Sequence, residues 1–539
     1  MGIPDKNNSM LSERVLFVYI DYDPWDPTVI GGTVPHGIPY LAGALNREKI
    51  SYKLFHLIKC LNEKELEEAI HLYNDFTVFA FSFTSPQKDE AYKIARIIKR
   101  LYPEKYIIVG GTHATVDPAD ILKNDDINCL CVGEGEDAIA EIVKNYRTGD
   151  LSTIPNIQYK IDGKVYKNNL SMKQTKSLDE FPIPDYSIFN FPDLHCYKAR
   201  IRYLPIMLSR GCPYNCSYCS NYVVFKVSKE SKRIITRIYS PRKAIDLIKE
   251  NLKLADFRSV NFDDDIIGID KEWNREFFVL YKKEINLPFK FYVRPEYVTE
   301  EFVKLAADAG CYRVTFGLEV GNEKIRYEIL NKRTKDKLFE ETFKLFHKYE
   351  IEVNTTNIIA VPTETMKDAL LTLKVNAKLN VDHTLRGVFQ PYPYTALYDY
   401  VKKHNLYADT NKEMCSSFEG SVLKFENFSH NQIEFVMAAW NLLFIIYRKL
   451  YQLPQSELLV KLFDLCIYSM RPLYPFAIFL RNKFFIGKLS TYLYRVLEKE
   501  LKWLEEDYKQ QQKGLFSFFR GGSNSKRAAT LAEYCSPEN

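Results

Sequence analysis

Short apolar runs alternate with amphipathic stretches between residues 14 and 144, and this alternation constrains the fold more than any other feature. The apolar runs read RVLFVYI, YKLFHL, FTVFAFSF, KYIIVGG and INCLCVG. Amphipathic stretches with helical spacing lie between them, at residues 38–47, 63–73 and 87–101. Buried strands that alternate with helices form βαβ units and pair in parallel. The sequence therefore predicts an α/β protein whose residues 1–150 form a doubly wound, Rossmann-like parallel sheet.

Polar or glycine-rich loops follow the later strands of this region, and they read SFTSPQ, GGTHAT and GEGE. The carboxyl ends of parallel strands meet at the sheet edge where ligands bind. Glycines there let the backbone approach a bulky ligand, although an isolated pair would serve only for a tight turn. Because the glycines recur at one edge, we predict a binding site there. Its candidate contacts are Ser82, Thr84, Gly110, Gly111, His113, Gly133 and Glu134.

Residues 151–200 have the composition of a linker. IQYKIDGKVYKNN predicts a hairpin that turns at Asp162 and Gly163, and SLDEFPIPDYSIFNFPDL is too rich in proline for regular structure. From residue 201 to 408 the alternation resumes, in the runs LPIMLS, RSVNFDD, FKFYVR, YRVTFGLE, VNTTNIIA and TLRGVFQ. These units predict a partial (β/α)6 barrel of the TIM type, with functional residues at the C-terminal ends of its strands.

Residues 409–515 are predicted to be helical and are rich in aromatic residues, with Lys and Arg interrupting the apolar runs. The simpler interpretation is a helical domain that packs its aromatic side chains on the barrel. The alternative is a surface that meets a membrane or an apolar substrate, because basic amphipathic helices suit a bilayer interface. The tail at residues 516–539 is predicted to be disordered.

Charge and cysteine content limit the partners and the compartment. The net charge of +5 is small for 539 residues, and its bases are mixed with acids, so we expect no nucleic-acid partner. The first residues lack the pattern of a secretory signal, and no uncharged apolar run reaches the ~18 residues that span a bilayer. We therefore predict a cytoplasmic protein whose eleven cysteines are reduced, with metal binding where they cluster.

Such a cluster occurs in RGCPYNCSYC, which contains Cys212, Cys216 and Cys219. A structural zinc site normally takes four protein ligands in pairs, whereas the nearest other cysteines, Cys196 and Cys311, are unpaired. A cubane held by three thiolates, with one iron left open, accounts better for the number of cysteines. No other pair of cysteines has cluster spacing, so we predict no auxiliary cluster.

The CxxxCxxC spacing, with Tyr218 before its last cysteine, resembles the signature of radical S-adenosylmethionine enzymes. The resemblance implies a [4Fe–4S] cluster whose open iron binds S-adenosylmethionine, and a 5′-deoxyadenosyl radical released by one electron. It covers roughly residues 10–410 and implies that Tyr218 also lies in the cofactor site. Asp263 and Asp264 in VNFDDDIIGID match acids that receive the methionine amino group, and Glu319 in FGLEVGNEKIRYEILNKR matches a ribose or amino contact.

Two positions depart from the pattern of that family. In AVPTET, Ala360 stands where the family usually has glycine, and in FQPYPYTALYDY, Tyr394 replaces another glycine. We expect the side chain of Tyr394 to reshape the substrate side of the cavity. Tyr394 and Glu319 are therefore the candidate catalytic residues.

The N-terminal region, with GGTHAT, VGEGE and GTVPHGIPYLAGAL, resembles the cobalamin-binding domain fused to one branch of these enzymes. The DxHxxG signature, which supplies a histidine to cobalt in other cobalamin proteins, is absent, as is usual in that branch. His36 is a candidate contact to cobalt, and a solvated loop histidine is the simpler interpretation. His113 is predicted to touch the corrin tail or to cap the following turn.

The resemblance implies a cobalamin-dependent enzyme that methylates an unactivated carbon of an apolar small molecule, natural product or lipid. S-adenosylmethionine would methylate the cobalamin and, in a second molecule, supply the radical, with electrons from flavodoxin or ferredoxin. Other members of the branch close rings or rearrange carbon skeletons without net methyl transfer, which is the alternative function. A cobalamin-binding regulator without catalysis is a more distant alternative.

Overall fold

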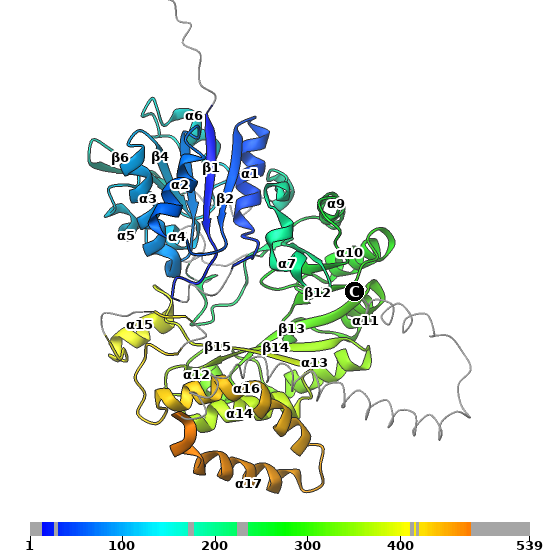
Figure 1. The fold of residues 1–539 in the computed structure, drawn as a ribbon. Coiled ribbons are helices and arrows are strands. Elements are labelled where there is room, and N and C mark those ends of the chain that lie inside the picture. Colours follow the sequence, from blue (N-terminus) through cyan, green and yellow to red (C-terminus); the bar gives the residue numbers. More distant parts are fainter. Residues whose placement is uncertain are drawn as a thin grey trace, which may run out of the picture. The chain divides into compact units, whose positions relative to one another are not determined.

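The computed structural model describes residues 13–25, 31–170, 177–221, 223, 236–409, 414–416 and 420–475 (Figure 1). The described residues up to Pro472 belong to one compact unit. The predicted tail at residues 516–539, and the predicted helical segment from residue 476 to 515, lie outside the described residues.

The N-terminal domain is built on a sheet of seven strands in the order β2-β1-β3-β4-β5-β6-β7. These strands are β1 (Arg14–Ile20), β2 (Ser51–Leu57), β3 (Val78–Ser82), β4 (Tyr106–Gly110), β5 (Cys129–Cys131), β6 (Ile157–Ile161) and β7 (Lys164–Lys167). Strands β1 to β5 pair in parallel, as predicted. The strand order reverses between β1 and β3, which places the ligand-binding crevice at their carboxyl ends.

Helices connect the parallel strands. They are α1 (Gly37–Arg47), α2 (Glu63–His71), η1 (Ser85–Gln87), α3 (Lys88–Leu101), α4 (Gly111–Val116), α5 (Pro118–Leu122) and α6 (Ile139–Asn145). Helix α2 begins where its sequence predicts, because Asn62 and Glu65 form a reciprocal capping box. The two faces of the sheet carry separate apolar cores, one around Phe79 and one around Phe17.

The predicted hairpin forms, with its turn at Asp162 and Gly163, both of which have positive φ. Strand β6 pairs antiparallel with β5, so the hairpin extends the N-terminal sheet past residue 150. The boundary between sheet and linker stays a prediction. Short elements follow the hairpin: η2 (Leu178–Glu180), η3 (Tyr186–Ile188), η4 (Phe191–Asp193) and α7 (His195–Lys198).

The central domain is a sheet of six parallel strands in the order β15-β14-β13-β12-β11-β8, which confirms the predicted partial barrel. Its strands are β8 (Tyr203–Ile206), β11 (Ser259–Phe262), β12 (Phe289–Tyr292), β13 (Cys311–Glu319), β14 (Glu352–Ile359) and β15 (His383–Val388). A separate antiparallel pair joins β9 (Ser209–Arg210) to β10 (Arg237–Ile238). The helices are α9 (Pro241–Leu252), α10 (Lys271–Glu284), η5 (Pro295–Tyr297), α11 (Glu300–Ala309), α12 (Glu323–Glu328), α13 (Asp336–Lys348), α14 (Met366–Lys378) and α15 (Ala396–Lys403).

Side chains alternate between the two faces of these barrel strands. Phe289 and Phe291 of β12 pack against Phe278 of α10 and Phe302 of α11, so they mark the outer, helix-covered face. Thr355 of β14 also points outward, to α14. The residues between them therefore face the inside of the barrel.

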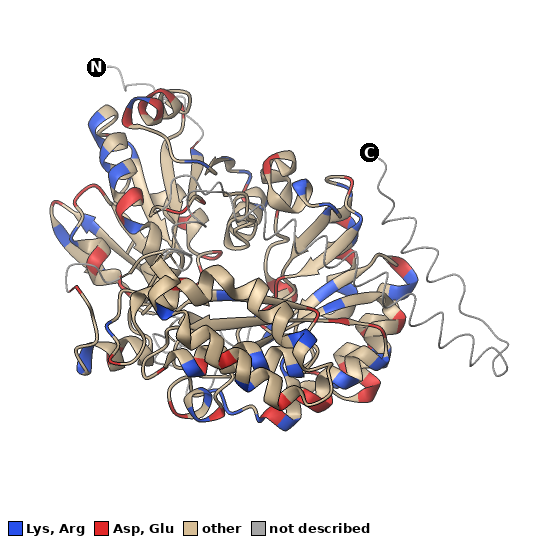
Figure 2. Cartoon of the chain, turned by 60° about the horizontal axis from the view of Figure 1, so that its bottom comes forward, with Lys and Arg blue, Asp and Glu red and all other residues tan. Residues whose placement is uncertain are grey.

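Helices α16 (His430–Leu450) and α17 (Ser456–Ser469) follow the barrel, as predicted for this region, and a turn, η6 (Arg471–Leu473), comes after them. Trp440 of α16 is fully buried and its Nε1 donates to Thr384 Oγ1 at 3.3 Å, which fixes α16 against β15. Among the described residues, no helix is long and apolar enough to cross a membrane. Basic and acidic residues are interspersed over the outer helices (Figure 2).

Candidate active site and cofactor sites

The three predicted metal ligands lie on one loop at the barrel mouth. Cys212, Cys216 and Cys219 follow β9, and all three are free thiols. Ser217 anchors this loop: its amide donates to Leu330 O at 3.0 Å, and its carbonyl accepts from Leu397 N at 2.8 Å. The loop is thereby held between the segments that follow β13 and β15.

The surroundings of these thiols suit a metal cluster. Burial raises the pKa of Cys212, and it raises that of Cys219 to about 12, so thiolates here require a metal. Arg294 Nη1 lies 3.8 Å from Cys216 Sγ and places a cation beside them. In the part of the chain that the structure describes, no three His, Cys, Asp or Glu side chains converge as ligands of one metal ion. The thiols fit a [4Fe–4S] cluster, in which each binds a different iron.

The structure brings together Tyr218 and Glu319, two of the predicted cofactor contacts. The carboxylate of Glu319 accepts from Tyr218 OH at 2.9 Å and from Lys332 Nζ at 3.0 Å, and all three side chains are largely buried. A Cβ at Gly317 would collide with the Glu319 carboxylate and the Lys332 ammonium, so this ion pair would have to shift if any other residue stood there. Lys332 is a partner that no sequence motif indicated.

The three consecutive acids after β11 point in different directions. Asp264 Oδ1 accepts from Leu208 N at 2.9 Å and from Ser209 N at 2.5 Å, and burial raises its pKa to about 7. Asp263 accepts from Asn261 Nδ2 at 2.5 Å, on the inner side of the barrel. Asp265 acts electrostatically on Cys212 and Cys219, so the acid beside the cysteine loop is one that we did not predict.

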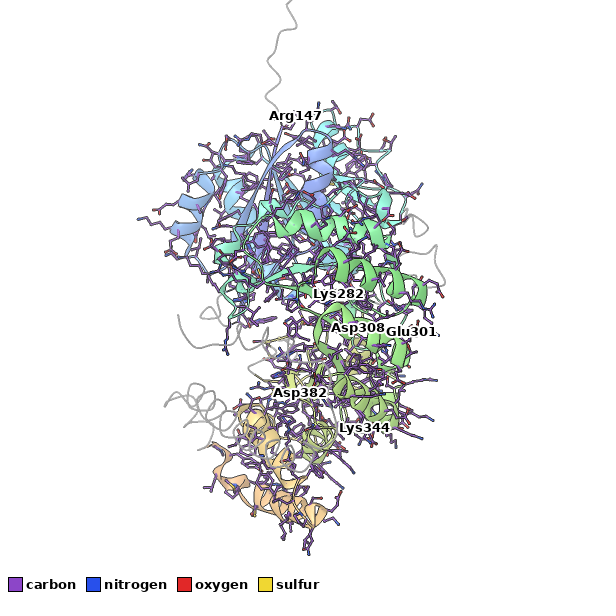
Figure 3. The ribbon with its side chains drawn as sticks, turned by 90° about the vertical axis from the view of Figure 1, so that its right-hand side faces the viewer. Arg147, Lys282, Glu301, Asp308, Lys344 and Asp382 are labelled. Atoms are coloured by element: carbon purple, nitrogen blue, oxygen red, sulfur yellow. The ribbon has the colours of Figure 1, made fainter. Side chains whose placement is uncertain are left out.

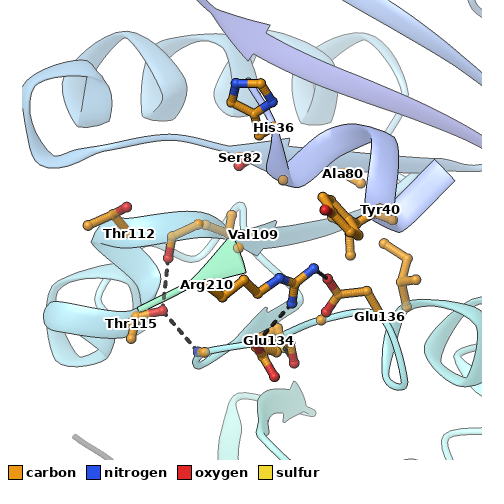
Figure 4. A pocket seen from close by; sticks show the side chains of 18 of the residues that line it. His36, Tyr40, Ala80, Ser82, Val109, Thr112, Thr115, Glu134, Glu136 and Arg210 are labelled. Carbon is orange, nitrogen blue, oxygen red and sulfur yellow. Dashed lines mark hydrogen bonds and ion pairs between the residues drawn. The ribbon is translucent and has the colours of Figure 1, made fainter. Parts of the chain in front are cut away.

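A cavity of about 480 Å³ opens at the carboxyl edge of the N-terminal sheet (Figure 4). The predicted residues that line it are Ser82, Gly110, Gly111, Gly133 and Glu134. Apolar side chains on one face of the sheet, such as Phe17, Ala80 and Ile139, also line it. An apolar slot with a polar, glycine-rich mouth fits a large ligand that is partly apolar and partly amide, as cobalamin is.

Thr115 joins the loops at the mouth of this cavity, and sequence reasoning missed it. Its hydroxyl donates to Gly111 O at 3.0 Å and accepts from Gly133 N at 2.9 Å (Figure 4). Gly111 has φ +86°, and a Cβ there would meet Ser82 Oγ at 2.9 Å and Phe83 N at 3.0 Å. Only glycine lets the loops approach this closely.

Thr84 and His113 are not among the residues that line the cavity. His113 is buried, with Nδ1 3.0 Å from Ser85 Oγ and Nε2 3.3 Å from Asp120 Oδ2. Thr84 N donates to Gln87 Oε1 at 2.8 Å and so begins η1. Both side chains serve local structure in this conformation, and their roles as cofactor contacts stay predictions.

Arg210 connects the cavity to the cysteine loop, and it lies two residues before Cys212. Its guanidinium donates to Glu134 Oε1 at 2.9 Å and to Glu136 Oε1 at 2.5 Å, both in the loop after β5. The same guanidinium lies 4.4 Å from the centroid of the Tyr40 ring. Arg237 of β10 also pairs with Glu134. Burial alone would raise the pKa of the Glu134 carboxyl, but the positive charges and hydrogen bonds of Arg237 and Arg210 outweigh it and lower this pKa below its ordinary value. The loop that lines the cavity is thus held against the loop of the three cysteines by buried ion pairs.

His36 reaches from the N-terminal domain to the barrel. Its Nδ1 lies 3.0 Å from Tyr186 OH, and its Nε2 lies 3.1 Å from Asp263 Oδ2. It also lines the cavity. Both ring nitrogens therefore have partners in the protein, so the simpler prediction, that this histidine lies in a loop with its ring in solvent, is wrong.

Ala360 and Tyr394 both adopt the left-handed backbone conformation that favours glycine. Their φ angles are +61° and +64°, a region that costs non-glycine residues of order 1 kcal/mol or more. Tyr394 is 45% exposed, and its hydroxyl interacts with Asp117 of the N-terminal domain. It stands at the junction of the two domains, and its catalytic role stays a prediction.

The buried carboxyl of Glu364, in the AVPTET segment, is expected to make the stability of the folded protein depend on pH. Burial raises its pKa from 4.5 to about 8, and Oε1 has no hydrogen-bond partner among the described residues. Between about pH 4.5 and pH 8 the folded chain keeps a proton that the unfolded chain releases, so stability falls as pH rises through that window. We expect Glu364→Gln to reduce this loss, by on the order of a few kcal/mol at pH 8 relative to pH 5.

Urea denaturation of the wild type and of Glu364→Gln at several pH values measures this effect. Glu341→Gln, at an exposed position on α13, is the matched control and should leave the pH profile unchanged. Parallel profiles for the wild type and Glu364→Gln would show that Glu364 is ionised in the folded protein.

Comparison with known proteins agrees with this geometry. Residues 206–375 match the radical SAM superfamily, and residues 28–143 match the B12 binding domain family. An uncharacterised methyltransferase of Pyrococcus horikoshii is 27% identical over 414 residues, which are 75% of this chain and 86% of the relative. The anaerobic magnesium-protoporphyrin IX monomethyl ester cyclase of Cereibacter sphaeroides is 23% identical, over 71% of this chain and 63% of the relative. The structure of the cobalamin-dependent S-adenosylmethionine radical enzyme OxsB superposes with a TM-score of 0.62 at 15% identity, covering 97% and 84% of the two chains.

The barrel and its three-cysteine loop define a radical S-adenosylmethionine enzyme. With its N-terminal domain, the chain belongs to the B12-binding radical S-adenosylmethionine enzymes, whose cofactors are a [4Fe–4S] cluster, S-adenosylmethionine and cobalamin. Such an enzyme needs a reductant and a substrate.

Proposed function

We propose that this enzyme transfers a methyl group from S-adenosylmethionine to an unactivated carbon of an apolar small molecule, natural product or lipid. The observation that carries the proposal is the Arg210 contact. It holds the cavity of the N-terminal domain against the loop of the three cysteines, so methyl carrier and radical source would share one site. The similarity to a methyltransferase over 86% of that relative also supports it.

When bound, the cluster and the cobalamin supply the electron that splits S-adenosylmethionine and the carrier for its methyl group. The side chains of this protein bind and orient. Cys212, Cys216 and Cys219 would hold the cluster. Tyr218 and Glu319 would position S-adenosylmethionine, with Lys332 holding the Glu319 carboxylate in place.

The loops of the N-terminal domain would hold cobalamin through Ser82, Gly110, Gly111, Gly133 and Glu134. Asp265 is added to the proposed cofactor contacts because it lies at the cavity and beside the cysteines. His36 would act as a positioning residue, since its hydrogen bond to Asp263 joins the cavity to the barrel interior. Tyr394, at the junction of the two domains, would shape the side of the cavity where the substrate binds.

A ring-closing or rearranging reaction without net methyl transfer is the second candidate. The similarity to a cyclase favours it, although that relative is matched over a smaller share of its length. The two candidates differ in whether carbon from the S-adenosylmethionine methyl group enters the product.

Isotope labelling separates these two reactions. The anaerobically reconstituted enzyme, a chemical reductant and methyl-deuterated S-adenosylmethionine are incubated with an apolar metabolite extract, and Cys216→Ala protein serves as the blank. We expect a deuterated product together with 5′-deoxyadenosine and S-adenosylhomocysteine. Turnover that forms 5′-deoxyadenosine and an unlabelled product would favour the second reaction and contradict methyl transfer.

Contact with a membrane through the C-terminal helices also stays a proposal. Its support is a stripe on α17 in which Leu458, Leu462 and Leu465 are 53%, 51% and 63% exposed. The sequence at residues 465–497, which begins within this helix, contains basic but no acidic residues, which suits an anionic bilayer surface. Co-sedimentation with anionic vesicles tests it, and Leu462→Glu should weaken the binding.

A flavodoxin or ferredoxin as electron donor is proposed from the family resemblance alone.

A further inference from the structure

The inner face of the barrel holds polar side chains in addition to exposed apolar ones. Lys290 and Tyr292 alternate with the outward-facing phenylalanines of β12, so both point inward. On β15, Leu385 pairs in register with Thr356 of β14. Because the neighbouring Thr355 faces outward, Thr356 and Leu385 face inward. Tyr292 is 38% exposed and Leu385 is 52% exposed. These two side chains offer an apolar surface inside the barrel.

Lys290 has no acidic partner in the residues that the structure describes. Its ammonium lies 5.0 Å from the centroid of the Tyr203 ring, and this cation–π contact leaves the charge uncompensated. Burial lowers its pKa, and the positive charge of Arg313 lowers it further, against the opposing effect of Asp263. A half-buried ammonium in such surroundings is stabilised when an anion binds to it.

The nearby acids are already engaged. Glu352 accepts from Arg313 Nε at 2.8 Å and from Arg313 Nη2 at 2.6 Å, and its Oε2 lies 3.2 Å from His383 Nε2. Asp263 is bonded to Asn261 and His36. Lys290 is therefore an inward-facing cation that a ligand can neutralise without breaking one of these bonds.

The position of Lys290 fits one end of a substrate. Arg294, which touches Cys216, is four residues further along an extended chain, on the order of 13 Å at the rise of a strand. Tyr292 lies between them on the same strand. A molecule bound at Lys290 would pass along Tyr292 toward the cysteine loop and the mouth of the cavity.

We propose that the substrate carries an oxyanion, a carboxylate or a phosphate, which binds to Lys290, while its apolar part lies against Tyr292 and Leu385. This inference rests on the proposed function, because it assigns the substrate of the same site. It narrows the substrate class from apolar molecules to acidic amphiphiles. The reacting carbon then lies several bonds from the acidic group, on the side of the cofactors.

Binding without turnover tests the proposal. Decanoate, decyl phosphate and decanol are titrated calorimetrically into the reconstituted holoenzyme with S-adenosylmethionine and no reductant. We expect an acidic ligand to bind at least tenfold more tightly than decanol, and the better of the two identifies the oxyanion. Lys290→Met should remove this preference, Lys290→Arg should keep most of it, and iron and cobalt contents should stay unchanged.

Lys282→Met is the matched control, because Lys282 is exposed on the outer helix α10 (Figure 3). It should bind all three ligands as the wild type does. Equal binding of acid and alcohol by the wild type, an acid preference that survives in Lys290→Met, or no binding at all would overturn the proposal. The binding experiment involves no methyl transfer. If the labelling experiment gave an unlabelled product while the enzyme still preferred acidic ligands, only the proposed methyl transfer would be contradicted, and the proposed substrate class would stand.

Discussion

Cys216→Ala is expected to lower the formation of 5′-deoxyadenosine by at least about a thousandfold, to the background of the assay. The thiol lies at the centre of the loop, it is buried, and Arg294 donates to it at 3.8 Å. Without it the cluster would have two thiolate ligands in place of three. Iron content should fall well below the about four atoms per chain of the reconstituted wild type.

Cys60→Ala is the control for this substitution, because Cys60 is an exposed, free thiol outside the site. It should keep the iron content and the rate of S-adenosylmethionine cleavage. Iron analysis, the visible spectrum and quantification of 5′-deoxyadenosine measure the effects. If Cys216→Ala retained a full cluster and its cleavage rate, the assignment of the three cysteines as its ligands would be wrong.

The strands could be predicted from the sequence because each is a short apolar run with a polar or glycine boundary. Strand β3 is a clear case, since VFAFS is buried along nearly its whole length and ends at the cavity. The cysteine loop was also readable, because its chemistry depends on local spacing. The extension of the sheet by β6 and β7 could not be predicted, because the local sequence indicates a hairpin but not the strand with which that hairpin pairs.

Long-range contacts could not be predicted. Arg210 and Glu136 are 74 residues apart, and no local pattern connects them. The choice among Asp263, Asp264 and Asp265 depends on how the backbone bends after β11, which consecutive acids do not reveal. The contact between His113 and Asp120 is only seven residues apart, but Asp120 lies on the following helix, α5, and no sequence pattern around His113 indicates that pairing.

Arg210→Met is expected to destabilise the fold by about 3–5 kcal/mol, as removal of one partner from a buried ion pair does elsewhere. The side chains of Arg210 and Glu136 are 15% and 6% exposed. Glu134 would keep Arg237, whereas Glu136 would lose its ion-pair partner and remain buried with a charge. Urea denaturation measures the loss, and the added substitution Glu136→Gln should recover much of it by removing that charge.

Arg242→Met is the matched control, because Arg242 also pairs with two carboxylates, Asp246 and Glu284, but on an exposed surface where such pairs contribute little. We further expect cobalamin-free Arg210→Met protein with a reconstituted cluster to bind cobalamin at least about tenfold more weakly than the wild type prepared in the same way, because the loop of Glu134 and Glu136 loses its attachment. Titration of cobalamin, followed by its visible spectrum, measures this. A variant that is as unstable as expected but binds cobalamin normally would make Arg210 a purely structural residue, and the shared site of the proposed function would lose its main support.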